Sequence, residues 1–195
     1  FDFSKGTGAS YAEGPNFAAG AEFVSGYICP SDPQGKELVF CCSTLQNGGS
    51  PDEDLAKTSW AGVADSVDWS CDGTWPDPNA DGILFQRSKI SAKHITDGTS
   101  NTLLTGEVIG AGPNNAFFWV TWDVLHTANG INLPLREPPL HPWVVPQTGF
   151  ASYHPLGCHF TLADSSVHFL SDSIDQRVFS ALTTRDGGDS VGNAF

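Results

Sequence analysis

Glycine and proline interrupt this chain so often that long regular helices are not expected. The 195 residues include 21 glycines and 13 prolines, spread from end to end. Glycine loses much conformational entropy in a helix, and proline lacks the N–H that a helix interior needs. Short strands joined by loops suit such a chain better. We therefore expect an α+β fold that is rich in β-structure, with an antiparallel sheet, long loops and a short C-terminal helix.

The length suits one domain, because 195 residues are enough to bury a core of their own. We predict a single globular domain over residues 1–195. Residues 1–22 are rich in glycine, alanine and serine, which indicates an irregular lead-in or an arm at an interface.

The charge balance excludes several classes of partner. The chain has 9 Lys and Arg residues against 22 Asp and Glu residues, a net charge of −13. Nucleic acids and anionic lipids are recognised by clustered basic side chains, so neither is expected as a partner. The longest apolar run, Ala116–Trp122, is far shorter than the roughly 20 residues that a membrane-spanning helix needs.

The strand predictions rest on apolar runs bounded by turn residues. The runs are residues 23–29, 38–42, 58–64, 101–109, 117–122, 158–162 and 166–170. The first two are expected to form a loose hairpin, and 101–109 and 117–122 to form the centre of the sheet. Short helical segments are predicted at 52–57 and 89–96, the latter closed by the Asp97–Gly98 turn.

The last third of the chain has the clearest pattern. Phe160 and Leu162 share one face of a strand, Val167 and Phe169 share one face of the next, and residues 163–165 supply a turn. This pattern predicts a β-hairpin. A helix should follow, with Asp172 or Ser173 as its N-cap, an end at Gly187–Gly188, and an apolar stripe of Ile174, Val178, Ala181 and Leu182.

Five cysteines lack the paired C-x-x-C spacing of a structural zinc site: Cys29, Cys41, Cys42, Cys71 and Cys158. Disulfides formed in an oxidising compartment are the better interpretation. We predict that Cys29 pairs with Cys41 or Cys42, and that Cys71 pairs with Cys158, which leaves one thiol over.

Residues 77–82 match the first half of a calcium-binding loop, D-x-N-x-D-G. The candidate ligands for Ca²⁺ are Asp77, Asn79 and Asp81. Ser88 stands where the twelfth position of such a loop has glutamate, so a bidentate carboxylate would come from Asp68 or Asp72. The alternative is a loop held by its own Asx turns, without an ion.

Catalytic patterns are weak, and no catalytic residue is predicted. His159 and His168 fall on adjacent predicted strands, but spacing alone provides neither an oriented partner nor a substrate pocket. No G-x-S-x-G elbow is present. Exposed tryptophans give an alternative function, a secreted carbohydrate-binding β-domain, through Trp60, Trp69, Trp75 and Trp143. The competing interpretation is that they fill the core and interfaces.

Several phrases of the sequence occur in a fixed order: Cys29–Pro33, Ile95–Leu104 with Gly106–Glu107, His154–Pro155 and Leu162–Leu170. Together they resemble a large bacterial family of prepilin-like proteins of unknown biochemical function. Members of that family usually begin with a prepilin leader and a hydrophobic helix, followed by a mostly β head. The head ends in a processing-associated signature, H-x9-DG. Here His154 precedes Asp164, and Ser165 stands in place of the glycine.

The resemblance implies a pilin-like or pseudopilin-like subunit that is secreted or on the cell surface and is not an enzyme. It would form or decorate a filament or a secretion-related assembly, as a homo-oligomer. Contact with a membrane would come only through the N-terminal helix, which this chain lacks. The chain would then be the soluble head, or a variant that assembles by other contacts.

Three local expectations complete the sequence-based interpretation. His154 is expected to pack back toward the predicted hairpin, and Asp164 to accept hydrogen bonds from the backbone N–H groups of Ser165 and Ser166. Self-association is expected through residues 1–22 and the proline-rich arm around Trp143.

Overall fold

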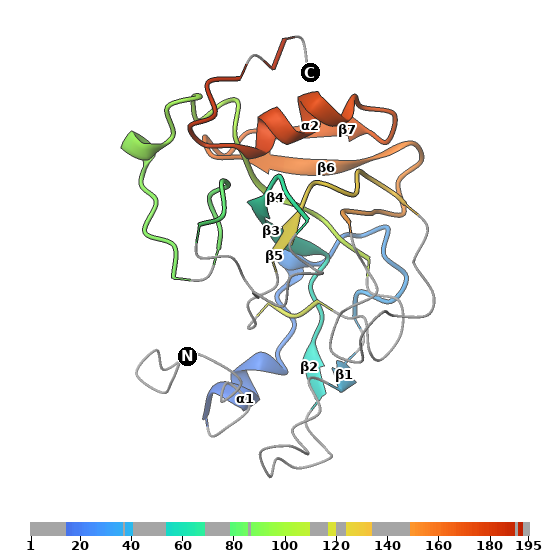
Figure 1. The fold of residues 1–195 in the computed structure, drawn as a ribbon. Coiled ribbons are helices and arrows are strands. Elements are labelled where there is room, and N and C mark those ends of the chain that lie inside the picture. The colour runs from blue at the N-terminus through green and yellow to red at the C-terminus, as the bar shows by residue number, and fades with distance from the viewer. Residues whose placement is uncertain are drawn as a thin grey trace. The chain divides into compact units, whose positions relative to one another are not determined.

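The computed structural model describes residues 15–36, 38–40, 54–68, 79–85, 87–109, 117–119, 124–133, 149–189 and 191–192. The chain forms two compact units, whose elements are labelled in Figure 1. The first unit is Phe1–Trp60 with Ile109–Asp123, and the second is Ala61–Val108 with Val124–Phe195. That residues 1–195 behave as a single domain stays a prediction.

The first unit contains short elements only: α1 (Pro15–Gly20), the 3₁₀ helix η2 (Ser25–Tyr27), β1 (Leu38–Phe40) and β2 (Asp54–Ala56). β1 and β2 pair in an antiparallel manner, with Val39 opposite Leu55. β1 confirms part of the run predicted at 38–42. The helical turn predicted at 52–57 is wrong, because that segment is the partner strand of β1. The described part of residues 1–22 contains α1 and so is not irregular throughout.

The strand predicted at residues 23–29 is also wrong. The N–H of Tyr27 donates to the carbonyl of Val24 (2.9 Å), and the N–H of Ile28 donates to the carbonyl of Ser25 (3.3 Å). These local bonds curl the backbone into η2 instead of an extended strand. The carbonyl of Tyr27 accepts the N–H of Ser59 (2.8 Å), so this segment contacts the residues after β2 through a single backbone bond and not through a strand ladder.

The second unit is built on a five-stranded sheet: β3 (Trp60–Asp65), β4 (Leu103–Glu107), β5 (Val124–His126), β6 (Gly157–Leu162) and β7 (Val167–Ser171). The strand order is β5-β3-β4-β6-β7. β4, β6 and β7 pair in an antiparallel manner, whereas β3 and β5 run parallel. The sheet is therefore mixed and not wholly antiparallel. The prediction of a β-rich α+β fold is confirmed.

Of the two segments predicted for the centre of the sheet, one is confirmed and the other is wrong over its described part. The run at 101–109 contains β4, which lies in the middle of the strand order. The run at 117–122 is not a sheet strand over its described part. Phe118 forms only an isolated bridge with Lys57, and both belong to the first unit.

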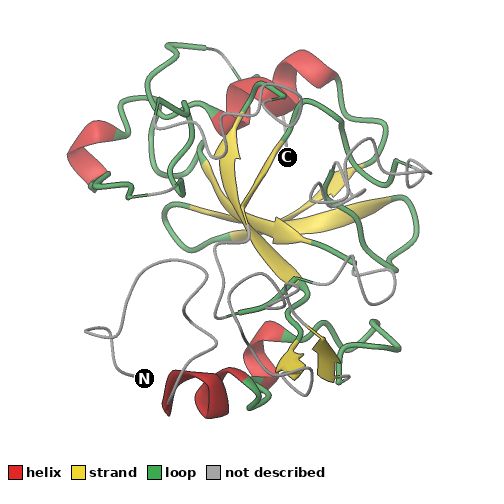
Figure 2. Cartoon of the chain, turned by 60° about the horizontal axis from the view of Figure 1, so that its bottom comes forward, coloured by secondary structure: helices red, strands yellow, loops and turns green. Residues whose placement is uncertain are grey.

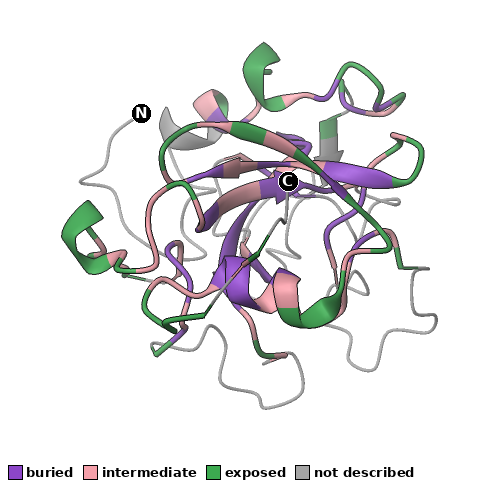
Figure 3. Cartoon of the chain, turned by 90° about the horizontal axis from the view of Figure 1, so that it is seen from above, coloured by how far each residue is buried: buried purple, intermediate pink, exposed green. Residues whose placement is uncertain are grey.

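The core of the second unit lies between the sheet and α2 (Gln176–Thr183). Phe179 of α2 contacts the rings of Phe150 and Phe160, with centroids 6.5 and 5.5 Å away. All three phenylalanines are fully buried. Figure 2 shows α2 in red beside the yellow strands, and Figure 3 shows the buried residues gathered in the strands and toward the C-terminal end of this helix.

The predicted C-terminal helix exists, but its ends differ from the prediction. Asp175 is the N-cap, and its side chain accepts hydrogen bonds from the backbone N–H groups of Arg177 (2.9 Å) and Val178 (3.4 Å). Asp172 and Ser173 precede the helix instead of capping it. α2 ends at Thr183, before the glycine pair at 187–188.

The predicted β-hairpin is confirmed. β6 and β7 pair in register from Gly157 opposite Ser171 to Thr161 opposite Val167. Phe160 and Leu162 are fully buried, but Val167 and Phe169 are 58% and 44% exposed. The apolar face that the second strand offers in sequence therefore points away from the core.

The helix predicted at 89–96 is reduced to one 3₁₀ turn, η4 (Ala92–His94). Its N-cap is Ser91, whose backbone N–H donates a hydrogen bond to Nδ1 of His94 (3.1 Å). No helix within the described parts of the chain is both long and apolar enough to span a bilayer.

Candidate functional site

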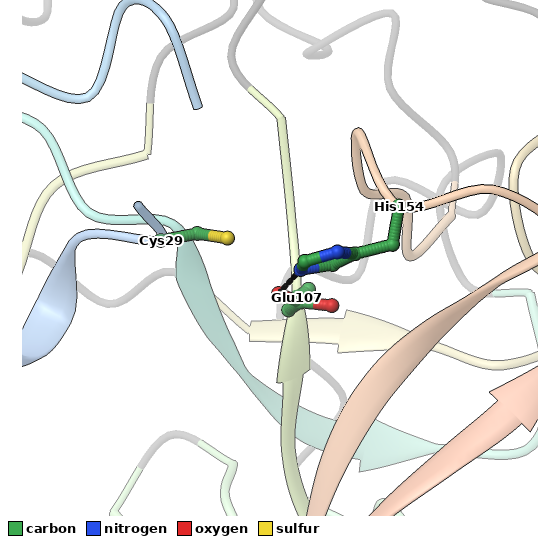
Figure 4. A group of neighbouring side chains, drawn as sticks. All are labelled: Cys29, Glu107 and His154. Atoms are coloured by element: carbon green, nitrogen blue, oxygen red, sulfur yellow. Dashed lines mark ion pairs between the residues drawn. The ribbon is translucent and has the colours of Figure 1, made fainter. Parts of the chain in front are cut away.

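A buried carboxylate, Glu107, lies at the end of β4 and is surrounded by donors. One oxygen, Oε2, accepts the backbone N–H of His159 (2.6 Å) and lies 3.1 Å from the Nδ1 of the same histidine. The other oxygen, Oε1, lies 3.2 Å from Nε2 of His154. Figure 4 shows the ion pair between Glu107 and His154; Cys29, also drawn, belongs to the first unit. We call Glu107, His154 and His159 the carboxylate–imidazole cluster.

The loop before β6 holds His154 in this position. Ala151 donates its N–H to the carbonyl of Glu107 (3.0 Å), which ties the start of the loop to β4. The Ser152 hydroxyl donates to the carbonyl of Gly157 (2.7 Å) and accepts the N–H of His154 (3.0 Å). The expectation that His154 packs toward the hairpin is confirmed, because its ring contacts that of His159 on β6 at 4.8 Å.

The cluster combines one buried group with two accessible ones. The Glu107 side chain is 3% exposed, whereas those of His154 and His159 are 27% and 36% exposed. A neutral His159 that donates from Nδ1 carries its lone pair on Nε2. Carboxylates orient imidazoles in this manner at catalytic sites and around bound metals. Chemically, the cluster can hold an imidazole whose Nε2 accepts a proton or binds a transition metal.

Asp164 lies at the tip of the hairpin and stabilises its turn. Its Oδ1 accepts hydrogen bonds from the backbone N–H (2.9 Å) and the hydroxyl (2.6 Å) of Ser166. These bonds hold the pKa of the Asp164 carboxyl below its usual range. The predicted bond from Ser166 is confirmed, but the one from Ser165 is wrong. Ser165 donates its N–H to the carbonyl of Leu162 (2.9 Å) instead, because a three-residue loop closes there.

A second aspartate, Asp97, fixes the C-terminal segment. Its Oδ2 accepts hydrogen bonds from the Thr184 hydroxyl (3.2 Å) and the Gly187 N–H (2.8 Å), and its Oδ1 accepts that of Gly188 (2.9 Å). The following residue, Gly98, has a φ of 99°, which favours glycine. The Asp97–Gly98 turn thus connects the segment before β4 to the segment after α2.

The same segment also supports the hairpin tip. Asp164 donates its N–H to the carbonyl of Thr99 (3.0 Å), and Ala163 donates to that of Thr102 (2.9 Å). Two phrases that carry the sequence resemblance, 95–104 and 162–170, are therefore in direct contact. Their shared role in the described structure is to hold turns in place.

The calcium hypothesis stays a prediction. Asp81 accepts hydrogen bonds from the N–H (2.8 Å) and the hydroxyl of Ser66, and Asn79 is exposed. Asp68, a proposed extra ligand, has its Oδ1 3.0 Å from Nε2 of His126. Asp72 and Asp77 lie outside the described residues.

His126 on β5 is the most deeply buried imidazole among the described residues. Its side chain is 3% exposed. Burial lowers its pKa below the usual value, and the neighbouring Asp68 carboxylate opposes that shift only in part. The folded protein therefore favours the neutral form of this side chain.

The remaining predicted residues fall largely outside the described part of the chain. Cys29 and Cys158 are buried, but Cys41, Cys42 and Cys71 are not described, so both disulfides stay predictions. Trp60 is half-buried on β3, whereas Trp69, Trp75 and Trp143 are not described. The contacts proposed for Trp143 and for residues 1–14 therefore also stay predictions.

Sequence reasoning missed Glu107 and Asp97. Glu107 ends an apolar strand, and a charged residue at such a place is a signal that its side chain has buried partners. Asp97 precedes a glycine, and that pattern alone predicts only a turn. Both needed the tertiary fold, because their partners lie 52 and about 90 residues further along the chain.

Comparison with known proteins identifies the family of this chain. No curated protein and no solved structure matches the chain. The model of a family described as protein of unknown function (DUF1559) matches residues 4–177. This span covers most of the 195 residues and includes the carboxylate–imidazole cluster, the hairpin and the Asp97 turn. The chain therefore belongs to the DUF1559 family of proteins of unknown function.

Proposed function

We propose that this chain is a pilin-like structural or assembly subunit, secreted or held at the cell surface, that forms or decorates a filament or a secretion-related assembly. It performs no catalysis in this role. A chain of net charge −13 is not suited to bind nucleic acid. Its partners are other protein subunits, including copies of itself.

The observation that carries the proposal is what His154 and Asp164 do in the fold. These residues anchor the resemblance to prepilin-like proteins, and they stabilise opposite ends of the paired strands β4, β6 and β7. Asp164 holds the hairpin turn through Ser166, and His154 clamps the preceding loop to Glu107. Structural positions of this kind fit an assembly subunit, whose surface must keep its shape.

The outer face of the hairpin supports the same proposal. Val167 and Phe169 are exposed there, and Leu156 in the preceding loop is 73% exposed. Phe169 lies against the ring of His159 at 5.1 Å, so the apolar surface adjoins the carboxylate–imidazole cluster. Neighbouring exposed apolar side chains are typical of protein–protein contacts.

The decisive experiment is to image the native particle. Cells that produce the protein are labelled with antibodies against this chain, and labelled particles are purified and examined by electron microscopy and intact-mass measurement. We expect regular particles in which the chain is a stoichiometric subunit. Finding the chain only as a dispersed monomer, in both cells and culture fluid, would contradict the proposal.

A variant separates assembly from catalysis. His154→Ala removes the clamp on Glu107, and it should reduce the yield of native particles while the chain remains detectable. Lys36→Ala, a change at an exposed position of the first unit, is the control and should leave the yield unchanged. If His154→Ala assembles normally but a hydrolytic activity of the particles is lost, the cluster is catalytic and the structural role is wrong.

A further inference from the structure

β7 is the last strand of the sheet, and one of its edges carries no partner strand among the described residues. The N–H of Leu162 donates to the carbonyl of Ser166 (2.9 Å), which sets the hydrogen-bonding pattern of the hairpin. In an antiparallel pair, every second opposed pair exchanges hydrogen bonds. Leu162 and Ser166 form a hydrogen-bonded pair, so the pair Phe160 and His168, two residues away along each strand, exchanges hydrogen bonds.

It follows that Val167 and Phe169 direct their N–H and C=O groups away from β6. Their side chains are 58% and 44% exposed. Strands at the edges of natural sheets are usually protected by lysine, proline or a bulge. The sequence of β7, Val-His-Phe-Leu-Ser, contains neither lysine nor proline, and its pairing with β6 has no bulge. Within the described part of the chain the strand is therefore an open site for a further segment.

Negative charge lies at both ends of this strand. Asp164 precedes β7 at the hairpin tip, Asp172 follows it directly, and both side chains are exposed. Asp164 is ionised under ordinary conditions, because its hydrogen bonds from Ser166 favour the carboxylate. We call Asp164–Asp172 the acidic edge. A segment that docks there should bring basic side chains around an apolar one.

The same unit contains a segment of that chemistry, Arg87–Lys93, which we call the basic segment. Arg87, Lys89 and Lys93 are exposed and make no ion pair within the described part of the chain. They are three of the nine Lys and Arg residues, and residues 83–96 contain no acidic residue. Ile90 is half-buried between them, and Ser91 has extended backbone angles (φ −126°, ψ 163°).

We propose that the basic segment of one copy docks on the acidic edge of the next copy. Lysines of the basic segment then meet Asp164 or Asp172, and Ile90 covers apolar surface at Phe169. This inference rests on the proposed function and names its subunit contact. Each copy offers one surface of each kind, so the contact is heterologous and can repeat from copy to copy.

Charge also argues against a contact between two identical edges. Two copies of β7 that pair with each other place four exposed carboxylates, from Asp164 and Asp172 of each copy, around one small contact. The net charge of −13 on each copy adds to this repulsion. A contact between unlike surfaces replaces that repulsion with attraction.

The test uses two variants of the 195-residue chain, examined by sedimentation velocity after circular dichroism has verified folding. The edge variant is Phe169→Lys, and the segment variant is Lys89→Glu with Lys93→Glu. We expect the wild-type chain to form a concentration-dependent series of species larger than dimers. Each variant alone should be monomeric, and an equal mixture should form dimers and nothing larger, because only one intact pair of surfaces remains.

Other outcomes overturn the inference. A segment variant that associates like the wild type shows that another surface makes the contact, and a wild-type chain that stays monomeric shows that copies do not dock. If Phe169→Lys fails to fold, Val167→Lys replaces it at the more exposed position of the same strand. The control variant, Lys36→Glu with Arg177→Glu, makes the same charge change at exposed positions elsewhere and should associate as the wild type does.

The native particle distinguishes failure of this inference from failure of the proposed function. If wild-type particles exist and the edge variant enters them in normal amounts, the contact is wrong while the assembly role stands. If no particle contains the chain, the assembly role itself is wrong.

Raising the salt concentration should weaken the association of the wild-type chain, because salt screens the attraction between opposite charges. An association that persists at high salt would mean that apolar burial alone drives the contact.

Discussion

The two faces of the β6–β7 hairpin carry similar apolar side chains but have opposite environments. On one face, Phe160 packs against Phe179 of α2 and is fully buried. On the other face, Phe169 is 44% exposed and contacts the half-exposed ring of His159. The difference lies in what covers each face, because α2 packs on only one of them. An apolar pattern in a strand therefore identifies a surface that can be buried, without identifying what buries it.

The largest expected effect comes from the covered face. Phe160→Ala should lower the free energy of unfolding by about 3 to 5 kcal/mol, because it leaves a cavity between Phe150 and Phe179. Phe169→Ala on the open face is the matched control and should cost about 1 kcal/mol or less. Urea denaturation of both variants measures the difference. Equal losses would mean that the open face is covered in the folded protein.

A second effect concerns Glu107, a buried group whose partner His159 lies on the open face. Glu107→Ala should destabilise the chain by about 2 to 3 kcal/mol, because the N–H of His159 and both imidazoles lose a charged partner. Asp186→Ala, which alters an exposed carboxylate 4.0 Å from Arg185, should change stability by less than about 0.5 kcal/mol. Thermal melts compare the two. A Glu107 variant as stable as the control would mean that the cluster holds nothing in place.

The β5 edge of the sheet can be probed through the pH dependence of stability. His126 on β5 is buried and has a lowered pKa, so the unfolded chain takes up a proton below about pH 6.5 that the folded chain resists. The contribution of His126 to the free energy of unfolding is fully present above that pH. It should fall by up to about 1.4 kcal/mol per pH unit as the pH drops toward the folded pKa.

His126→Gln should remove this part of the pH dependence, as measured by denaturation between pH 7.5 and 5. His94→Gln, at an exposed position, should leave the slope unchanged and serves as the control. An unaltered slope in His126→Gln would mean that other groups take up the proton.

The smallest expected effect lies at the hairpin tip. Ser165 has a φ of 71°, a conformation that costs a non-glycine residue about 1 kcal/mol. Ser165→Gly should therefore raise the free energy of unfolding by up to about 1 kcal/mol. Ser100→Gly, whose backbone lacks a positive φ, should bring no gain. A loss of stability in Ser165→Gly would show that its side chain, and not its backbone, matters for the turn.

Local pattern was sufficient where neighbours in sequence are also neighbours in the fold. The β6–β7 hairpin needs only an apolar alternation and a short turn, and both are visible between residues 157 and 171. The helix after it was predicted from an apolar stripe. Its N-cap was misplaced by a few residues, because several polar residues before it could each have capped it.

The local sequence pattern predicted the wrong element in two situations. In one the pairing partner of a segment is distant in sequence, and in the other local hydrogen bonds compete with strand formation. Residues 52–57 contain enough polar residues to suggest a helical turn, yet β2 forms because β1 offers an edge to pair with. Residues 23–29 are apolar enough for a strand, but the local bonds of η2 curl the backbone instead. β5 is three residues long and has no periodicity to detect.

The sequence by itself determined that the protein is acidic, rich in loops and β-structure, and closed by a hairpin and a short helix. Those properties follow from charge, from glycine and proline, and from local periodicity. The tertiary structure decided that His154 and His159 meet Glu107, that Asp97 holds the C-terminal segment, and that Phe169 faces outward. Hydrogen-bond partners distant in sequence meet only when the strands take their order, so no local pattern could have revealed these contacts.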